Sequence, residues 1–148
     1  MKSSSHAAIS LVAGLAALAV TTPTVPGWAV VVVAVGVGVG IDFDHFLIAR
    51  YRTGHWGAAR RCLRDPSLVF FRQEEIFEEG DVGALNRLLT HVLIGGLVVP
   101  VLWTRRPYLA GVVALSLYAH VLADLVAGVR KRRGLERAAA TDSEIGDD

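Results

Sequence analysis

The sequence WAVVVVAVGVGVGI, residues 28–41, is followed directly by Asp42, Phe43, Asp44 and His45. A carboxylate at the end of a long apolar run is costly unless it is paired, hydrated or bound to a cation. On a helix, Asp42 and His45 are three positions apart and share a face, with Asp44 roughly a quarter-turn or more away. These side chains either end a membrane span by facing water or form part of a site. The positions of the other histidines decide between the two.

The run before Asp42 is best interpreted as a membrane helix. Valine favours strands, but an isolated strand cannot cross lipid. Ile41 stands where the last glycine of a G-x-G-x-x-G nucleotide loop would be, which excludes that motif. Gly36 and Gly40 form a small-xxx-small pair, which predicts a surface for close packing between helices.

Composition also indicates a membrane protein. The chain has 148 residues, enough for one domain; 53% of them are hydrophobic and 20% are charged. Soluble domains average about 25% charged residues, and here the apolar residues are gathered into long runs. Cys62 is the only cysteine, so no internal disulfide and no Cys-x-x-Cys motif is possible. We expect membrane lipids as partners and no specific nucleic acid.

We predict an all-α fold, an integral membrane four-helix bundle over residues 1–133. A polar, partly helical loop at 50–87 would join the second and third spans, and an acidic tail at 134–148 would be disordered. The predicted spans are residues 7–21, 28–49, 88–103 and 108–129. The first apolar run also fits a signal peptide with a cleavage site at Ala17-Leu18-Ala19. A retained span is favoured because no soluble domain follows and because His6 then has a use.

The distribution of basic residues predicts the topology. Four spans place both termini on one side, together with Lys2, the seven arginines of the 50–87 loop and the cluster Arg130-Lys131-Arg132-Arg133. The other side has only Arg105 and Arg106. The positive-inside rule therefore places both termini and the long loop in the cytoplasm.

This topology brings four of the five histidines and three aspartates to one membrane depth, near the cytoplasmic side. Histidine and aspartate together suit zinc, with manganese or iron as alternatives. Seven candidate ligands are more than the four that one tetrahedral zinc ion binds. Either two divalent ions bind, or some of the seven groups hydrogen-bond to the ligands and orient them. His120 and Asp124 could instead form a plain hydrogen-bonded pair. The predicted metal ligands are His6, Asp42, Asp44, His45, His91, His120 and Asp124.

The order of these residues resembles the YdjM-like family, over roughly residues 6 to 128. The shared pattern is an early His, an Asp-x-Asp-His at a helix end, an Arg-x-x-Thr-His that opens a later helix, and a His-x-x-x-Asp in the last helix. Members are small inner-membrane proteins, usually described as predicted membrane-bound metal-dependent hydrolases. The matching residues are His6; Asp42, Asp44 and His45; Arg87, Thr90 and His91; His120 and Asp124.

The chain departs from the family pattern at several positions, so it would be a divergent member. Ile41 stands where the family usually has proline, and Asn86 stands where it has histidine. Leu125 to Arg130 also match the family poorly. The family itself is distantly similar to zinc-dependent phospholipase C and related nucleases, which implies phosphoester hydrolysis by analogy.

The first functional hypothesis is a metal-dependent hydrolase at the cytoplasmic membrane face, acting on a small or lipid-linked anionic substrate. Asp44 would be a bridging ligand or general base, and Arg87 would stabilise the anionic substrate or transition state. The alternative is a non-catalytic scaffold in which a metal, or a His–Asp network, is structural. An ion or proton pathway ranks last, because the distal halves of the spans are nearly all Val, Leu, Ala and Gly.

Overall fold

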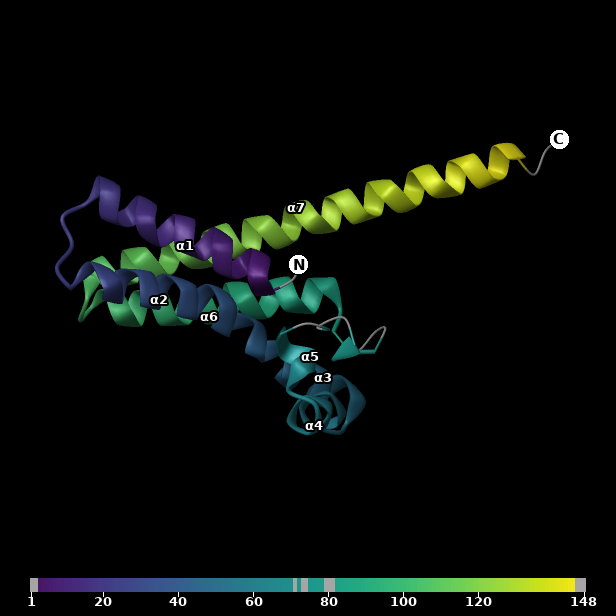
Figure 1. Ribbon diagram of the computed structural model, residues 1–148, viewed down its shortest axis with the longest axis horizontal. Helices are drawn as coiled ribbons and strands as arrows, with labels where there is room; N and C mark the ends of the chain where they lie inside the picture. The colour runs from purple at the N-terminus through teal and green to yellow at the C-terminus, as the bar shows by residue number, and fades with distance from the viewer. Residues whose placement is uncertain (1–2, 71, 73–74, 79–81, 146–148) are drawn as a thin grey trace.

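The computed structural model describes residues 3–70, 72, 75–78 and 82–145. Within these ranges the chain is helical and contains no strand, which confirms the all-α prediction. Four long helical segments lie side by side, and the N-terminus, α3 to α5 and the free part of α7 share one end of the molecule (Figure 1). The elements are α1 Ser3–Val20, α2 Gly27–Gly40, the 3-10 helix η1 Ile41–Phe43, α3 Asp44–Thr53, α4 Gly57–Arg64, α5 Ser67–Phe70, α6 Ala84–Trp103 and α7 Pro107–Ile145.

Three helical stretches are long and apolar enough to cross a membrane: Gly27–Thr53, Leu85–Trp103 and Pro107–Ala138. A fourth apolar helix, Ser4–Val20, is shorter. Many large apolar side chains on these helices face outward, for example Leu93 and Leu97 on α6. Exposed apolar surface on this scale is typical of a protein that contacts lipid rather than water. The fold is therefore consistent with a membrane protein.

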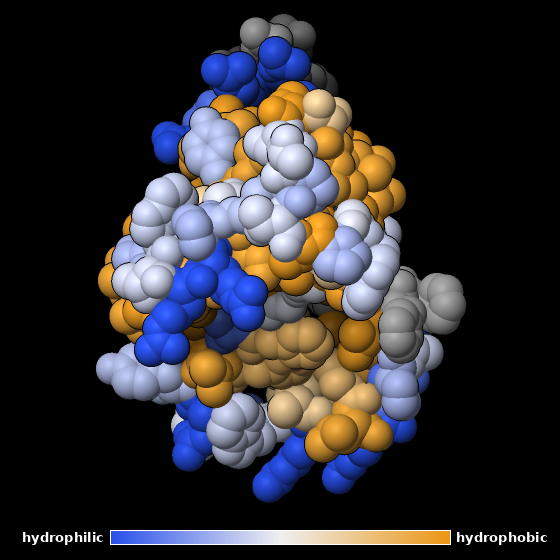
Figure 2. Space-filling view, turned by 90° about the vertical axis from the view of Figure 1, so that its left-hand side faces the viewer, coloured by the Kyte–Doolittle hydropathy of each residue, from blue (hydrophilic) through white to orange (hydrophobic). Residues whose placement is uncertain are grey.

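The bundle is a three-helix unit with a fourth helix at its side. α1, α2 and α7 each pack against the other two, whereas α6 packs chiefly on α7. One core cluster, Ala17, Val30, Ala34 and Val112, joins the three-helix unit. Seen from the end that carries the α1–α2 connection and the α6–α7 turn, the surface is mostly hydrophobic or weakly polar (Figure 2).

The second predicted span changes its helical geometry at the Asp-x-Asp-His motif. α2 ends at Gly40, η1 forms one tight turn, and α3 then continues to Thr53. A short 3-10 stretch inside a long helix often marks a functional position. Ile41 anchors this turn, because it is buried against Val113 and Leu117 of α7. The helix thus ends at Thr53 rather than at Ala49. Gly54, the next residue after Thr53, adopts a left-handed conformation (φ 77°) and ends the helix.

The glycines that permit close helix packing are not the predicted pair. A Cβ atom at Gly36 or Gly40 would meet nothing within 4 Å, so neither glycine lies at a tight contact. Gly38 does, since a Cβ there would overlap the hydroxyl of Ser10 and lie 3.2 Å from Ser116 Oγ. The interpretation of Gly36 and Gly40 as a packing surface is therefore wrong. A glycine of α2 does permit close helix packing, but the sequence could not show which face of α2 meets α1 and α7.

The segment between α3 and α6 is partly helical, as predicted. α4 and α5 pack through Ala58 and Leu68 with Ile76, which is 6% exposed. Arg61 holds this arrangement, because its guanidinium donates to the Ile76 carbonyl at 3.1 and 2.9 Å and pairs with Glu78 at 2.6 Å. α6 begins at Ala84, so the third span is one turn longer than residues 88–103.

The final helix is longer than expected. We predicted disorder from residue 134, but α7 continues to Ile145, and the yellow end of the chain extends far beyond the bundle (Figure 1). The prediction of disorder is therefore wrong for residues 134–145, while 146–148 lie outside the described residues. Strong helix formers after Gly134 explain the difference, and Arg132 pairs with Glu136 at 2.9 Å across one turn.

Candidate metal centre

The seven predicted ligands lie together at the end of the bundle where α3 leaves it. They come from α1, the η1–α3 turn, α6 and α7, so the site depends on all four long segments. His6, His91 and His120 are at most 2% exposed, and Asp44 and His45 are also buried. Polar side chains buried to this degree need partners, because an unsatisfied buried group costs about 1–3 kcal/mol.

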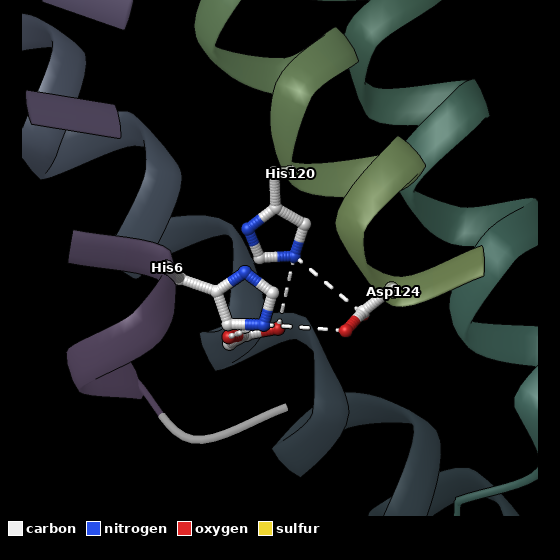
Figure 3. Close-up of side chains that lie close together, drawn as sticks. His6, His120 and Asp124 are labelled. Atoms are coloured by element: carbon white, nitrogen blue, oxygen red, sulfur yellow. Dashed lines mark ion pairs between the residues drawn. The ribbon is translucent and has the colours of Figure 1, made fainter. Parts of the chain in front are cut away.

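One group of potential ligands is formed by His6, Asp42, His120 and Asp124. His6 from α1 and His120 and Asp124 from α7 point toward the same region (Figure 3). His6 Nε2 lies 3.2 Å from Asp124 Oδ1, and His120 Nε2 lies 3.4 Å from Asp42 Oδ1. The two imidazole rings are stacked, with their centroids 3.8 Å apart.

A second group is formed by Asp42, His45 and His91. His45 Nε2 lies 3.5 Å and His91 Nε2 lies 3.9 Å from Asp42 Oδ1. Asp42 therefore belongs to both groups, and its Oδ1 faces His45, His91 and His120. Asp44, predicted as a bridging ligand or general base, belongs to neither group and lies beside the second one. In this geometry the carboxylate that joins the two groups is Asp42.

The separations between these atoms fit ligands around a common cation. Tetrahedral zinc with bonds of about 2.0–2.1 Å separates its ligand atoms by about 3.4 Å. The nitrogen–oxygen distances from His6 to Asp124 (3.2 Å), from His120 to Asp42 (3.4 Å) and from His45 to Asp42 (3.5 Å) agree with that value. They are longer than the optimal charge-assisted hydrogen bond of about 2.7–2.9 Å.

Several ligand atoms have no hydrogen-bond partner among the described residues, although they are buried. These atoms are His6 Nδ1 and Nε2, Asp42 Oδ1, His45 Nε2 and His120 Nε2. Most buried polar groups in proteins are hydrogen-bonded, so a set of unsatisfied atoms that converge needs an explanation. Cations bound in the two groups would satisfy Asp42 Oδ1 and the Nε2 atoms of His6, His45 and His120. His6 Nδ1 would not be satisfied in this way, because one imidazole offers a single nitrogen to a given cation.

The orientation of the His120 ring is the one that a metal ligand would need. Its Nδ1 lies 2.7 Å from the Gly38 carbonyl oxygen. Because a carbonyl oxygen can only accept, Nδ1 carries a proton, and in a neutral ring Nε2 would then present a lone pair. That lone pair faces the carboxylates of Asp42 at 3.4 Å and Asp124 at 3.8 Å. Metal-binding histidines usually donate their second ring N–H in this way, to a backbone carbonyl or a carboxylate.

The charges in the cluster favour a cation as well. Three carboxylates, those of Asp42, Asp44 and Asp124, meet in the cluster, and the guanidinium of Arg87 pairs with Asp124 Oδ2. Buried charges in proteins are paired or coordinate metals. A divalent cation is a partner that would suit the carboxylate of Asp42. Arg87 is 29% exposed, so it lies at the edge of the cluster rather than inside it.

The surroundings of Asp44 suggest how it is oriented. Its Oδ2 accepts a hydrogen bond from the Thr90 hydroxyl, and its Oδ1 lies 3.3 Å from His91 Nε2 and 3.5 Å from His45 Nε2. The 3-10 turn helps to bring Asp44 near Asp42, since two residues span about 240° in a 3-10 helix and about 200° in an α-helix. The tighter turn reduces the angle between the two side chains to about 120° from about 160°.

Sequence reasoning did not find the Gly38 carbonyl as the partner of His120. No pattern marks a backbone carbonyl, although a glycine one turn before the motif is consistent with a close approach. Thr90 was part of the family resemblance but had no assigned role. The fifth histidine, His55, lies in the exposed turn after α3 and takes no part in the cluster; its Nδ1 accepts from Gly57 N at 3.1 Å.

Fold and site together define a helical membrane-type protein with a buried His/Asp cluster able to hold a metal ion. No protein-family model, no curated protein and no solved structure matches the chain.

Proposed function

We propose that the protein is a metal-dependent phosphoester hydrolase of the membrane surface. The observation that carries the proposal is the convergence of unsatisfied, buried imidazole and carboxylate atoms from four helical segments. Asp42, shared by both groups, would hold two ions or hold one ion in the centre of the cluster. A bound divalent cation would lower the pKa of a water molecule toward 7 and so supply hydroxide as nucleophile. The order of the nine residues that resemble the YdjM-like family pattern favours the same proposal.

The residues at the edge of the cluster would complete the reaction. Arg87, at the partly exposed edge, would stabilise the charge that develops on the phosphoryl oxygens. Asp44, held by Thr90, would accept the proton that the attacking water loses. The water oxygen would bond to phosphorus as the ester P–O bond breaks, and the leaving alcohol would take up a proton. Asn86, the departure from the family pattern, is exposed, so its substitution removes no group from the buried cluster.

We further propose that α1 acts as a fourth span and that the cluster lies at the cytoplasmic leaflet. α1 is packed against α2 and α7 along its length. α3 and α4, which carry arginines, lie at the end of the bundle that holds the cluster (Figure 1). The part of α7 that contains the basic residues 130–133 extends from the same end. The opposite end has Arg105 and Arg106 alone in its turn. The positive-inside rule then gives this orientation.

The histidines supply a matched test of the hydrolase proposal. With a chromogenic phosphodiester and added zinc or manganese, the purified protein in detergent should hydrolyse the ester, and a chelator should abolish the activity. His91→Ala should lower the activity by more than about 100-fold, because losing a ligand exceeds the 10–100-fold effect of losing a ligand's hydrogen-bond partner. His55→Ala, which alters an exposed turn, should leave the activity unchanged.

The same experiment separates catalysis from a structural role. A wild-type protein that holds metal tightly but hydrolyses neither phosphodiesters nor phosphomonoesters would favour the scaffold alternative. The observation behind that alternative is that the cluster joins α1, the η1–α3 turn, α6 and α7, as a structural metal would. Equal loss of activity in His55→Ala and His91→Ala would contradict the assignment of the site to the cluster.

A further inference from the structure

An open hollow of about 380 Å³ lies between α6 and α7 on the outside of the bundle. α6 contributes Gly95, Gly96 and Val99 to its wall, and α7 contributes Leu117 and Val121. The two adjacent glycines make the hollow, since no side chain projects from α6 at these positions. A Cβ at Gly96 would meet nothing within 4 Å.

The hollow lies beside the candidate metal centre and meets it at His91. His91 lines one end of it, and the same imidazole lies 3.3 Å from Asp44 and belongs to the second ligand group. Arg87, one turn before His91 on α6, pairs with Asp124 at the edge of the cluster. A molecule in the hollow would therefore have one end at the cluster and the other end among apolar side chains.

The dimensions and chemistry of the hollow fit a hydrocarbon chain. It follows α6 from His91 to Pro100, which is about 14 Å at a rise of about 1.5 Å per residue. This is about half of the hydrocarbon thickness of a bilayer, which is about 30 Å. Apart from His91 and the exposed Tyr118, the lining residues are glycine or apolar.

We infer that the hollow binds an acyl chain of the substrate and that the substrate is a phospholipid whose phosphate lies at the His/Asp cluster. The inference rests on the proposed function for the headgroup and on the groove for the chain. A cation held by the cluster, together with Arg87, selects an anionic headgroup at one end. The apolar groove selects a chain at the other end, and the surrounding bilayer supplies molecules that have both.

Two glycines provide a matched pair of variants. Gly96→Leu places a side chain in the groove, whereas Gly111→Leu places one on an exposed part of α7 that does not line it. A Cβ at either position meets nothing within 4 Å, so both variants should fold. The probe is phosphatidic acid with a photoreactive diazirine in the middle of one acyl chain, incorporated with the protein into nanodiscs. Adducts are mapped by peptide mass spectrometry.

The wild-type protein should carry adducts on residues 91–100 and 114–121 in excess over the other lipid-facing helices. Gly96→Leu should reduce these adducts about tenfold, the effect of losing about two buried methylene groups, and Gly111→Leu should leave them unchanged. Diacylglycerol with the same diazirine should give fewer groove adducts, because it lacks the phosphate. Adducts spread evenly over all outward faces, or unaffected by Gly96→Leu, would overturn the inference. So would a dimer that forms through this face and is lost in Gly96→Leu.

Hydrolysis measured on the same samples keeps the two proposals distinguishable. Groove adducts that depend on Gly96, in a protein that hydrolyses no phosphoester, would overturn the hydrolase proposal and support the chain-binding groove. The wild-type protein and Gly96→Leu could instead hydrolyse a short, soluble phosphodiester and a long-chain lipid at equal rates. That result would support the hydrolase proposal and overturn the chain-binding groove. If both proposals hold, Gly96→Leu lowers the hydrolysis of the long-chain lipid alone.

Discussion

Replacing Asp42 by alanine is expected to remove the bound metal from both ligand groups at once. Asp42 is the residue that the two groups share, and its Oδ1 lies within 3.9 Å of Nε2 of His45, His91 and His120. Removing it takes away a ligand and leaves the imidazoles to face a cavity. The affinity for metal should fall by more than about 100-fold, beyond the 10–100-fold typical of changes to a ligand's hydrogen-bond partners.

Elemental analysis of detergent-purified protein measures this effect directly. Asp42→Asn keeps the shape of the side chain and should also lose metal, so a folding defect in the alanine variant can be recognised. Glu136→Ala removes an exposed carboxylate on the free part of α7 that pairs only across one helical turn with Arg132. That control should retain the wild-type metal content. Metal retained in full by both Asp42 variants would contradict the assignment of the cluster.

Gly38→Ala is expected to destabilise the protein, and Gly36→Ala is expected to be neutral or slightly stabilising. A Cβ at Gly38 would overlap the Ser10 hydroxyl and lie 2.7 Å from Ser10 Cβ, whereas a Cβ at Gly36 meets nothing within 4 Å. Forcing an extra methyl group into a well-packed contact costs about 1–3 kcal/mol. The two variants lie two residues apart in one helix, so their intrinsic helix propensities are matched.

The packing change should also reach the metal centre. The Gly38 carbonyl accepts the hydrogen bond that fixes the His120 ring, so a shift of α2 against α1 would misplace Nε2. Thermal unfolding in detergent, with and without added zinc, measures both effects. The double variant Ser10→Gly with Gly38→Ala makes room for the new methyl group and should recover part of the lost stability. Equal melting temperatures of the Gly36 and Gly38 variants would show that this contact is not close.

The sequence was informative about the site because its ligand types are rare inside membranes. The apolar runs predicted the four spans, and charge segregation predicted their orientation, which placed His6, His91 and His120 at one expected depth. The structure brings these residues together with Asp42, Asp44, His45 and Asp124. Hydrophobic runs and charge are one-dimensional signals, so they predicted which residues share one end of the bundle.

Rotation about each helix axis was the part that the sequence could not supply. It determines that Gly38, not Gly36 or Gly40, meets Ser10, and that Asp42, not Asp44, joins the two groups. The second outcome depends on the 3-10 turn at Ile41–Phe43, which changes the direction of every side chain that follows. No propensity predicts such a turn, because it is set by the packing of Ile41 on α7.

The position of α6 was likewise invisible in the sequence. Its hydrophobic pattern predicted a span, but not that α6 would pack chiefly on α7 and leave a hollow beside Gly95 and Gly96. A glycine pair inside an apolar helix is equally typical of a tight helix contact. Only the three-dimensional arrangement shows that Gly96 faces open space.

The metal ligation of the wild-type protein tests the central claim most directly, and zinc-edge X-ray absorption spectroscopy of the zinc-loaded protein measures it. The account predicts a first shell of nitrogen and oxygen atoms at about 2.0–2.2 Å, with the scattering pattern of imidazole and no sulfur at about 2.3 Å. Cys62, the only cysteine, lies on α4, packs with Ala58, Leu68 and Ile76, and belongs to neither ligand group. A sulfur shell, or a zinc ion surrounded only by water oxygens, would contradict the account.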